Sequence, residues 1–215
     1  MIKTVGLILC RAGSKGVPGK NKKIINGRPL FSYQVSNLRN AGVEEVYIST
    51  DDEDIKILEK EYNFIAIDRP SEISNDTAKC EAALLHFANL VNFDILAFAQ
   101  ATSPMCPPTY LAQGIDMVVN DMCDSAVSVV EEHWLPRWDM AMNPQGWEPS
   151  KRPRRQDRPC LYVENGAFYI TKRECLLESG VRYSGSIKPV VMPLIDSFQI
   201  DTYDDFDLMK KLMEK

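Results

Sequence analysis

The sequence predicts an α/β fold in which a mostly parallel β-sheet is flanked by helices. Short apolar segments of strand length alternate with segments of helical spacing through the first 130 residues. Such alternation is typical of parallel sheets with right-handed crossover connections. The chain has 215 residues, 45% of them hydrophobic and 26% charged. This composition suffices for a sizeable core and excludes extended disorder, so we expect a single domain over residues 1–215.

Each element of the first half follows from a local pattern. Residues 4–10 (TVGLILC) are continuously apolar, as expected for a strand buried on both faces. Residues 30–40 have apolar side chains at helical spacing and stop just before a glycine. Residues 45–49 (EVYIS) form a second strand, and the two aspartates that follow can cap a helix over 53–62. The alternation continues with strand 64–68, helix 77–90, strand 95–99, helix 110–120 and strand 125–130.

The pattern breaks at residues 131–162. This segment contains all three tryptophans, several prolines and a cluster of basic residues. Loops of this length are uncommon inside compact domains and are usually functional. We interpret the segment as an extended arm that grips another subunit. Regular structure then resumes with strand 167–171, helix 172–179, strand 188–192 and helix 203–215, which completes a Rossmann-like sheet with an inserted dimerisation arm.

Membrane proteins, secreted proteins and zinc proteins are disfavoured. No window approaches 18 consecutive apolar residues, and the apolar stretch at 5–10 is too short for a signal sequence. The six cysteines are scattered without any C-x-x-C pair, which argues against zinc and against a disulfide framework. We therefore expect a soluble cytoplasmic protein whose thiols are buried or incidental.

The net charge of −5 hides a strong asymmetry along the chain. Residues 1–43 contain eight basic side chains and no acidic one, and residues 151–158 contain five basic residues and one acid. The remaining residues include 12 basic and 29 acidic side chains. Locally basic loops on an otherwise acidic protein indicate a pocket for a small polyanion rather than a nucleic-acid surface.

The chemistry is expected in the loops that follow the strands, because ligands of parallel sheets bind beyond the carboxyl ends of the strands. These loops are 11–23, 50–52, 69–76 and 100–108. The first reads RAGSKGVPGKN over residues 11–21. Its glycines let the backbone approach a ligand, and its cations neutralise oxyanions. It matches neither G-x-x-x-x-G-K-[ST] nor G-x-G-x-x-G.

Five segments carry a resemblance to a known family. They are LCRAGSKG with the later KN (9–21), RPSEI with DTA (69–78), QATSP (100–104), NGAFY (165–169) and IDT (200–202). In this order they resemble the motifs of the acylneuraminate cytidylyltransferases, the CMP-sialic acid synthetases. The segment RPRRQD (152–157) is similar to the animal-type members. The resemblance covers most of the chain.

This resemblance implies an activity. Members of the family join CTP to a nine-carbon 2-keto sugar acid, such as N-acetylneuraminate or its deaminated relative KDN, and release pyrophosphate. The reaction uses Mg²⁺ and takes place in a homodimer. Phosphoryl-group chemistry of this kind asks the protein mainly to position two anions and to stabilise charge on the phosphates.

On the nucleotide side, the resemblance implies that Arg11, Lys15 and Lys20 neutralise the triphosphate and the leaving pyrophosphate. Ser14 and Asn21 would bind phosphate or ribose.

Arg69 would contact the cytosine, and the backbone around Cys80 would close the base pocket. A surface salt bridge is the alternative role for Arg69. Gln100 would touch the nucleotide or the sugar, and Asn165 and Tyr169 would line the sugar side.

The resemblance makes Asp201 the candidate Mg²⁺ ligand, whereas a purely local interpretation makes it a cap of the last helix. Arg155 would reach the sugar carboxylate in the neighbouring subunit's site. Three residues depart from the family pattern: Gln199 replaces the first aspartate of D-I-D, Cys80 stands where some relatives have Ser, and Val163 replaces an Arg of some bacterial members.

Several alternatives stay open. The sugar could be legionaminic acid, pseudaminic acid or KDO. The protein could also be a catalytically silent CTP-binding regulatory protein, an interpretation that Gln199 favours and the retained basic residues oppose. A nucleic-acid-binding role is weaker, because no basic stripe with interleaved aromatic residues lies outside the arm.

Overall fold

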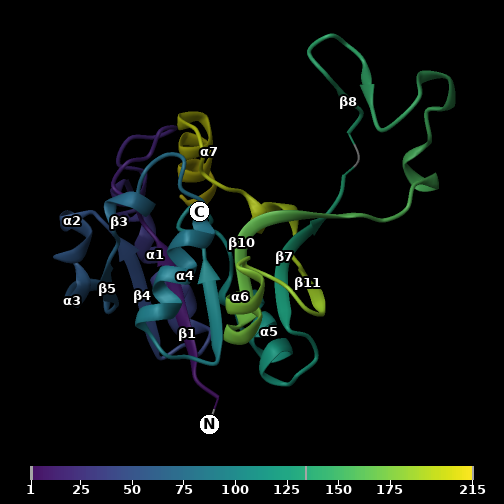
Figure 1. Ribbon diagram of the computed structural model, residues 1–215. Helices are drawn as coiled ribbons and strands as arrows, with labels where there is room; N and C mark the ends of the chain where they lie inside the picture. Colours follow the sequence, from purple (N-terminus) through teal and green to yellow (C-terminus); the bar gives the residue numbers. More distant parts are fainter. Residues whose placement is uncertain (1, 134, 215) are drawn as a thin grey trace.

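The computed structural model describes residues 2–133 and 135–214, without the side chain of Arg155. Its centre is a seven-stranded sheet in the order β11-β7-β10-β6-β1-β4-β5 (Figure 1). All neighbouring strands pair in parallel except β10, which is antiparallel to β6 and β7. The strands are β1 (Thr4–Leu9), β4 (Glu45–Thr50), β5 (Ile65–Asp68), β6 (Ile95–Ala99), β7 (Ser125–Glu131), β10 (Tyr162–Lys172) and β11 (Ile187–Val191). The predicted mostly parallel sheet is confirmed.

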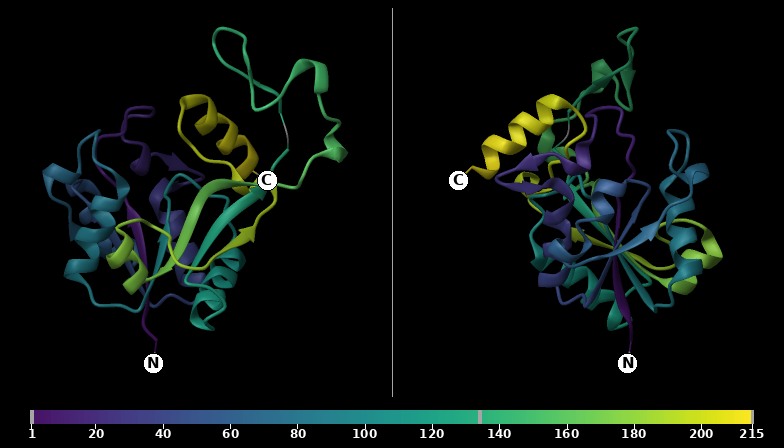
Figure 2. Two further views of the ribbon diagram at one scale, coloured as in Figure 1. Left: turned by 45° about the vertical axis from the view of Figure 1, so that its right-hand side comes forward. Right: turned by 90° about the vertical axis from the view of Figure 1, so that its left-hand side faces the viewer.

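Helices cover both faces of this sheet (Figure 2). One face carries α1 (Leu30–Asn40) and α5 (Pro108–Val119), and the other carries α4 (Cys80–Leu90) and α6 (Arg173–Ser179). The last helix, α7 (Tyr203–Met213), lies at the end of the molecule opposite the N-terminus, close to the loop that follows β1 (Figure 1). The carboxyl ends of the parallel strands point to that same end.

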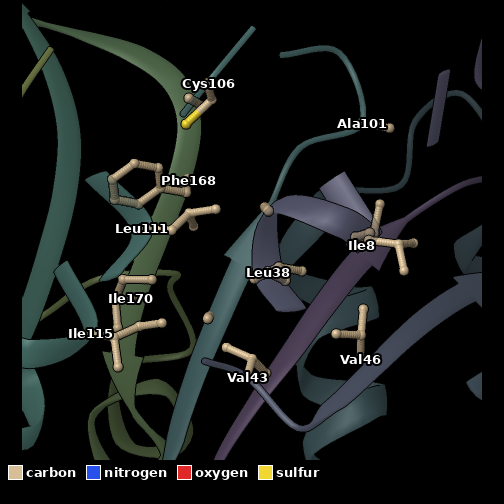
Figure 3. Packing of buried hydrophobic residues seen from close by; sticks show 14 of the residues in the cluster. Ile8, Leu38, Val43, Val46, Ala101, Cys106, Leu111, Ile115, Phe168 and Ile170 are labelled. Atoms are coloured by element: carbon tan, nitrogen blue, oxygen red, sulfur yellow. The ribbon is translucent and has the colours of Figure 1, made fainter. Parts of the chain in front are cut away.

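The core forms two layers because successive side chains of a strand point to opposite faces. Leu7 packs in the layer with Phe87 of α4, whereas the next residue, Ile8, packs in the layer with Leu38 of α1. Figure 3 shows the second layer, in which Leu111 and Ile115 of α5 lie beside Phe168 and Ile170 of β10. β1 is therefore buried on both faces, as its continuous apolar sequence predicts.

Two predicted helices differ from the structure. The segment 53–62 forms two short helices, α2 (Glu53–Lys56) and α3 (Glu59–Tyr62), because the backbone leaves helical geometry at Leu58. Helix α4 begins at Cys80 and not at 77. There the Asn75 side-chain oxygen accepts hydrogen bonds from the backbone of Thr77 and Ala78, and this turn precedes the helix. A small hairpin of β2 (Ile24–Ile25) and β3 (Arg28–Pro29) was not foreseen.

The segment between β7 and β10 extends away from the sheet (Figures 1 and 2). It contains the two-stranded pair β8 (Arg137–Trp138) and β9 (Pro144–Gln145) and the 3-10 turns η3 (Pro149–Lys151) and η4 (Arg155–Asp157). The rings of Trp138 and Trp147 pack edge to face at 5.0 Å. This extended shape is that of an arm. Across residues 2–133 and 135–214, no helix is long and apolar enough to cross a membrane.

Candidate active site

The loop after β1 brings its basic side chains into contact with two other segments. Arg11 Nη1 donates to Asp76 Oδ1 at 2.7 Å, and Lys15 Nζ lies 3.1 Å from Asp76 Oδ2. The backbone N–H of Ala12 donates to Asp51 Oδ1 at 2.8 Å, which fixes the start of the loop to the end of β4. Ser14 lies in the same loop. Two of the predicted phosphate-binding cations therefore lie side by side, against a carboxylate of the DTA segment to which the sequence analysis assigned no role.

Lys20 lies in η1 (Lys20–Lys22) and faces the segment before α7. Its side chain is only 14% exposed, and its Nζ donates to the backbone oxygen of Ile200 at 2.7 Å and to Asp201 Oδ1 at 3.0 Å. Asn21 is buried, and its amide nitrogen donates to the backbone oxygen of Arg11 at 3.2 Å. Asn21 thus holds the loop in its fold. The structure brings Lys20 and the candidate metal ligand Asp201 together.

Gly16 lies against the same segment so closely that no side chain fits. A Cβ atom at this position would be 2.0 Å from the backbone oxygen of Asp201. No L residue larger than glycine tolerates such a contact, so the glycine sets how closely the loop approaches Asp201. The spacing of the loop motif therefore has a direct structural reason.

Asp201 is not the cap of α7, the role that a purely local interpretation gives it. Thr202 is the N-cap, and the Asp205 carboxylate accepts hydrogen bonds from the backbone N–H groups of Asp201 and Thr202. The hydrogen bond from the Thr202 hydroxyl first, and these backbone bonds second, hold the pKa of Asp205 below its usual range. Because Thr202 and Asp205 cap the helix, the side chain of Asp201 is not needed there and faces Lys20, with 68% of its surface exposed.

Arg69 follows β5 and is buried, which excludes a surface salt bridge. Its Nε and Nη2 both donate to the backbone oxygen of Ile73, at 2.9 and 2.5 Å. Burial lowers the pKa of the guanidinium, while the nearby Cys80 thiol and Asp51 carboxylate act in the opposite direction. Arg69 therefore shapes the loop that leads to Cys80, the first residue of α4.

Gln100 and Asn165 lie where β6 ends and β10 passes it. The backbone N–H of Gln100 donates to the oxygen of Ala167 at 2.9 Å. The Asn165 amide donates to Ser197 Oγ at 2.9 Å, and its oxygen accepts from the backbone of Ala167 at 3.1 Å. Gly166, which lies between Asn165 and Ala167 in the sequence, has φ +69°, and a Cβ atom there would be 2.3 Å from the amide nitrogen of Gln199. The NGA segment thus makes a tight backbone bend against Gln199.

Tyr169 belongs to a polar and aromatic cluster that sequence reasoning largely missed. Its ring stacks on Phe98 at 5.9 Å and on Tyr183 at 5.8 Å. The hydroxyls of Tyr169 and Tyr183 donate to the two carboxylate oxygens of Glu164, at 3.1 and 2.9 Å. Burial first and the Glu164 charge second raise the pKa of Tyr169 to about 12. Its hydroxyl therefore stays protonated over the physiological range.

Arg182 completes this cluster. Its guanidinium lies 5.1 Å from the centre of the Tyr169 ring and donates to Glu81 Oε1 at 2.7 Å. Glu81 follows Cys80 in α4, and, although burial lowers the pKa of the Arg182 guanidinium, the hydrogen bond with Glu81 raises it above its usual value. The Arg182–Glu81 ion pair thus joins the start of α4 to the cluster around Tyr169. Glu164 directly precedes the NGA segment and could have been found from that position, whereas no pattern marks the loop of Arg182.

The predicted site residues thus fall into connected groups. Arg11 and Lys15 pair with Asp76 of the loop before α4, whereas Lys20 pairs with Asp201 just before α7. Arg155 lies in η4 of the arm, and its side chain lies outside the part that the structure describes. Within the described residues, no group of three or more His, Cys, Asp or Glu side chains could hold a metal ion. A protein-only metal cage is therefore absent from that part of the chain. A single carboxylate beside bound phosphates, which Mg²⁺ accepts, fits Asp201.

The chain is similar to known cytidylyltransferases along most of its length. The profile of the cytidylyltransferase family matches residues 5–213. N-acylneuraminate cytidylyltransferase A of Danio rerio is 32% identical over 210 residues, which are 94% of this chain and 48% of that protein. CMP-N,N'-diacetyllegionaminic acid synthase of Legionella pneumophila is 30% identical over 99% of this chain and 97% of its own. The chain spans about half the length of the fish relatives it matches.

Solved structures give the same fold. A CMP:2-keto-3-deoxy-manno-octonic acid synthetase complexed with CTP superimposes with a TM-score of 0.74, over 99% of this chain and 98% of that one. The sequence identity is 20%, so this likeness concerns the fold alone.

Proposed function

The chain belongs to the cytidylyltransferase family, and from that premise we propose that it transfers CMP from CTP to a free nine-carbon 2-keto sugar acid. N-acetylneuraminate and KDN are the proposed acceptors, and pyrophosphate is the second product. The observation that carries this proposal is the pairing of three cations of the loop after β1 with carboxylates of other segments: Arg11 and Lys15 pair with Asp76, and Lys20 pairs with Asp201. The names of the fish and Legionella relatives support it.

The basic residues would act on the phosphates. The anomeric hydroxyl of the sugar would attack the α-phosphorus of CTP and lose its proton to water, while the bond to the bridging oxygen breaks and pyrophosphate leaves. Charge grows on the leaving phosphates as that bond breaks. Arg11 and Lys15 would bind these oxygens, because a guanidinium and an ammonium donate charge-assisted hydrogen bonds to phosphate. Lys20, held by the backbone oxygen of Ile200, would approach from the other side of the loop.

Asp201 would hold Mg²⁺ together with phosphate oxygens and water. When bound there, the ion would neutralise charge on the triphosphate. Two features support this role: the Asp201 carboxylate does not cap α7, and the close approach of Gly16 brings its backbone against the phosphate-binding loop. Gln199 contributes no carboxylate, so a single protein carboxylate would serve.

The remaining site residues would divide between base and sugar. Arg69, fixed by Ile73, would contact the cytosine beside Cys80. Gln100, Asn165 and Tyr169 would line the sugar side, and Ser14 and Asn21 would border the phosphates or ribose. Arg155 of one subunit would reach the sugar carboxylate in the other subunit's site, since a planar guanidinium matches a carboxylate.

A homodimer with exchanged arms would complete the site. Apolar side chains that line a groove at the base of the arm support this arrangement, among them Leu135, Val163, Val191 and Leu194. Contiguous exposed apolar surface of this kind is typical of protein interfaces. All six cysteines are free, which is consistent with the cytoplasm.

Other nonulosonate acceptors form the second candidate. The full-length match to a legionaminic acid enzyme favours legionaminic acid among them. A silent CTP-binding protein is the third, and Gln199 is the residue that favours it.

Pyrophosphate release with CTP, Mg²⁺ and a panel of sugar acids tests the proposal. The panel contains N-acetylneuraminate, KDN, legionaminic acid, pseudaminic acid and KDO, with Asp201→Ala as the blank. The proposal predicts turnover with N-acetylneuraminate or KDN that is lost in the variant. Turnover with legionaminic acid, pseudaminic acid or KDO, and not with the two proposed acceptors, would identify that acid as the acceptor instead. CTP binding without any turnover would support the silent protein.

A further inference from the structure

Asp76 contacts two of the cations that the proposed function assigns to the triphosphate. One carboxylate oxygen accepts from Arg11 Nη1 at 2.7 Å, and the other lies 3.1 Å from Lys15 Nζ. Each oxygen therefore engages a different cation, and the carboxylate bridges both. Asp76 comes from the loop between η2 (Ser71–Ile73) and α4, far in sequence from the loop it contacts.

The carboxylate is not required by the fold of its own loop. The turn at this point is formed by Asn75, whose side-chain oxygen accepts from the backbone N–H groups of Thr77 and Ala78 at 3.0 and 2.9 Å. No hydrogen bond of Asp76 within its own loop is present among the described residues, and its side chain is 42% exposed. The main interactions of this carboxylate are thus with Arg11 and Lys15.

A carboxylate and a phosphate compete for the same donors. Both accept charge-assisted hydrogen bonds from a guanidinium or an ammonium, with similar geometry. The hydrogen bonds from Arg11 and then from Lys15 lower the pKa of Asp76, so it is fully ionised at neutral pH. A phosphate can also displace Asp76 from Lys15, because exposed ion pairs are weak and the Lys15 side chain is 74% exposed.

We propose that Asp76 is an internal competitor for the phosphate-binding cations, which lowers the affinity for CTP and speeds the release of pyrophosphate. This inference rests on the proposed function. Before the reaction the carboxylate holds Arg11 and Lys15 in place. After it, the same carboxylate takes over their N–H groups as pyrophosphate departs, so that the cations are never left without an anion. No covalent step is involved.

Calorimetric titration with Mg²⁺–CTP and, separately, with inorganic pyrophosphate tests this role in the full-length chain. Asp76→Asn removes the charge and keeps an oxygen that Arg11 can contact. We expect it to bind both ligands about three to ten times more tightly than the wild type, with pyrophosphate a correspondingly stronger product inhibitor. Asp76→Glu restores the charge and should return both affinities to within about twofold of the wild type.

The matched control is Asp54→Asn. This substitution also removes one exposed carboxylate from an ion pair near the loop, with Lys22 at 2.7 Å, but it leaves Arg11 and Lys15 untouched. Its affinities should equal those of the wild type, which separates local competition from a change in net charge. Should Asp76→Asn not fold, Asp76→Ser carries the same expectation.

Two results would overturn the inference. Unchanged affinities in Asp76→Asn would mean that the carboxylate does not compete. Weaker CTP binding with Mg²⁺ present, and unchanged binding with EDTA, would make Asp76 a metal ligand instead. A wild-type chain that binds pyrophosphate but not CTP would refute the proposed function, while the pyrophosphate titration would still decide the role of Asp76.

Discussion

Gly16→Ala perturbs the contact between the phosphate-binding loop and the segment before α7. The added methyl carbon would lie 2.0 Å from the backbone oxygen of Asp201, whereas ordinary van der Waals contact begins at 3.4 Å. The loop or the segment must therefore retreat by more than 1 Å. The methyl carbon is attached directly to the backbone, and the oxygen that it meets is a backbone atom, so no flexible side chain can absorb the clash by changing its rotamer.

The retreat separates groups that the proposed reaction needs together. Lys20 Nζ is held at 2.7 Å from the backbone oxygen of Ile200, next to Asp201, and the same segment carries the proposed metal ligand. A misplacement of about 1 Å at a reacting centre costs about 100-fold in rate. We expect kcat/KM for CTP to fall about 100-fold in Gly16→Ala, measured by continuous pyrophosphate release.

Gly13→Ala is the matched control, because a Cβ at residue 13 meets nothing within 4 Å. It lies in the same loop and receives the same methyl group, so its activity should stay within about threefold of the wild type. Wild-type activity in Gly16→Ala would refute the argument that this close approach positions the catalytic groups. Equal losses in both variants would mean that any methyl group in this loop obstructs the ligand or stiffens the loop, and that the contact with Asp201 is not what matters.

Three further predictions concern stability, pH and the sugar side. Phe168→Ala should lower the free energy of unfolding by about 3–5 kcal/mol in urea titrations, because this side chain is fully buried between β10 and α5; a loss below about 1 kcal/mol would contradict the core packing. Hydrogen bonds from Ser186 first, and from the Lys172 ammonium second, hold the pKa of Asp124 well below its usual range. This carboxylate therefore stabilises the fold above about pH 4, and that contribution is lost as the pH falls through the lowered pKa. Asp124→Asn should therefore lower Tm at pH 7 and flatten its decline on acidification; parallel Tm–pH curves would contradict this. Tyr169→Phe loses the hydrogen bond to Glu164 and should raise KM for the sugar acid about tenfold while KM for CTP stays constant; a rise in KM for CTP alone would place Tyr169 on the nucleotide side.

The sheet could be predicted because its strands have distinctive patterns. β1 and β6 are continuous apolar runs of strand length, which is the pattern of a strand buried on both faces of a parallel sheet. The direction of β10 could not be predicted in the same way. β7 and β10 are consecutive strands of the sheet joined by the arm without a helical crossover, which permits antiparallel pairing. Residue patterns show that a strand is present and not which way it runs.

The candidate site was predictable where the chemistry lies in one loop. The basic residues and glycines after β1 point to an anion regardless of the rest of the fold. Asp76 was recognised only as part of the DTA segment, and Arg182 and Tyr183 were not recognised at all. The roles of all three depend on contacts between loops distant in the sequence. Asn21 has a contact that the sequence did not predict, because its amide donates to the backbone oxygen of Arg11; its role at phosphate or ribose stays a prediction.

The measurement that tests the central claim most directly is ³¹P NMR of a reaction mixture with CTP, Mg²⁺ and N-acetylneuraminate or KDN. The account predicts that CTP disappears while one pyrophosphate and one CMP-sugar phosphodiester appear in equal amounts, and that omission of the sugar stops the reaction. Conversion of CTP to CDP and inorganic phosphate, or consumption of CTP without any sugar, would contradict the proposed attack of the sugar hydroxyl on the α-phosphorus.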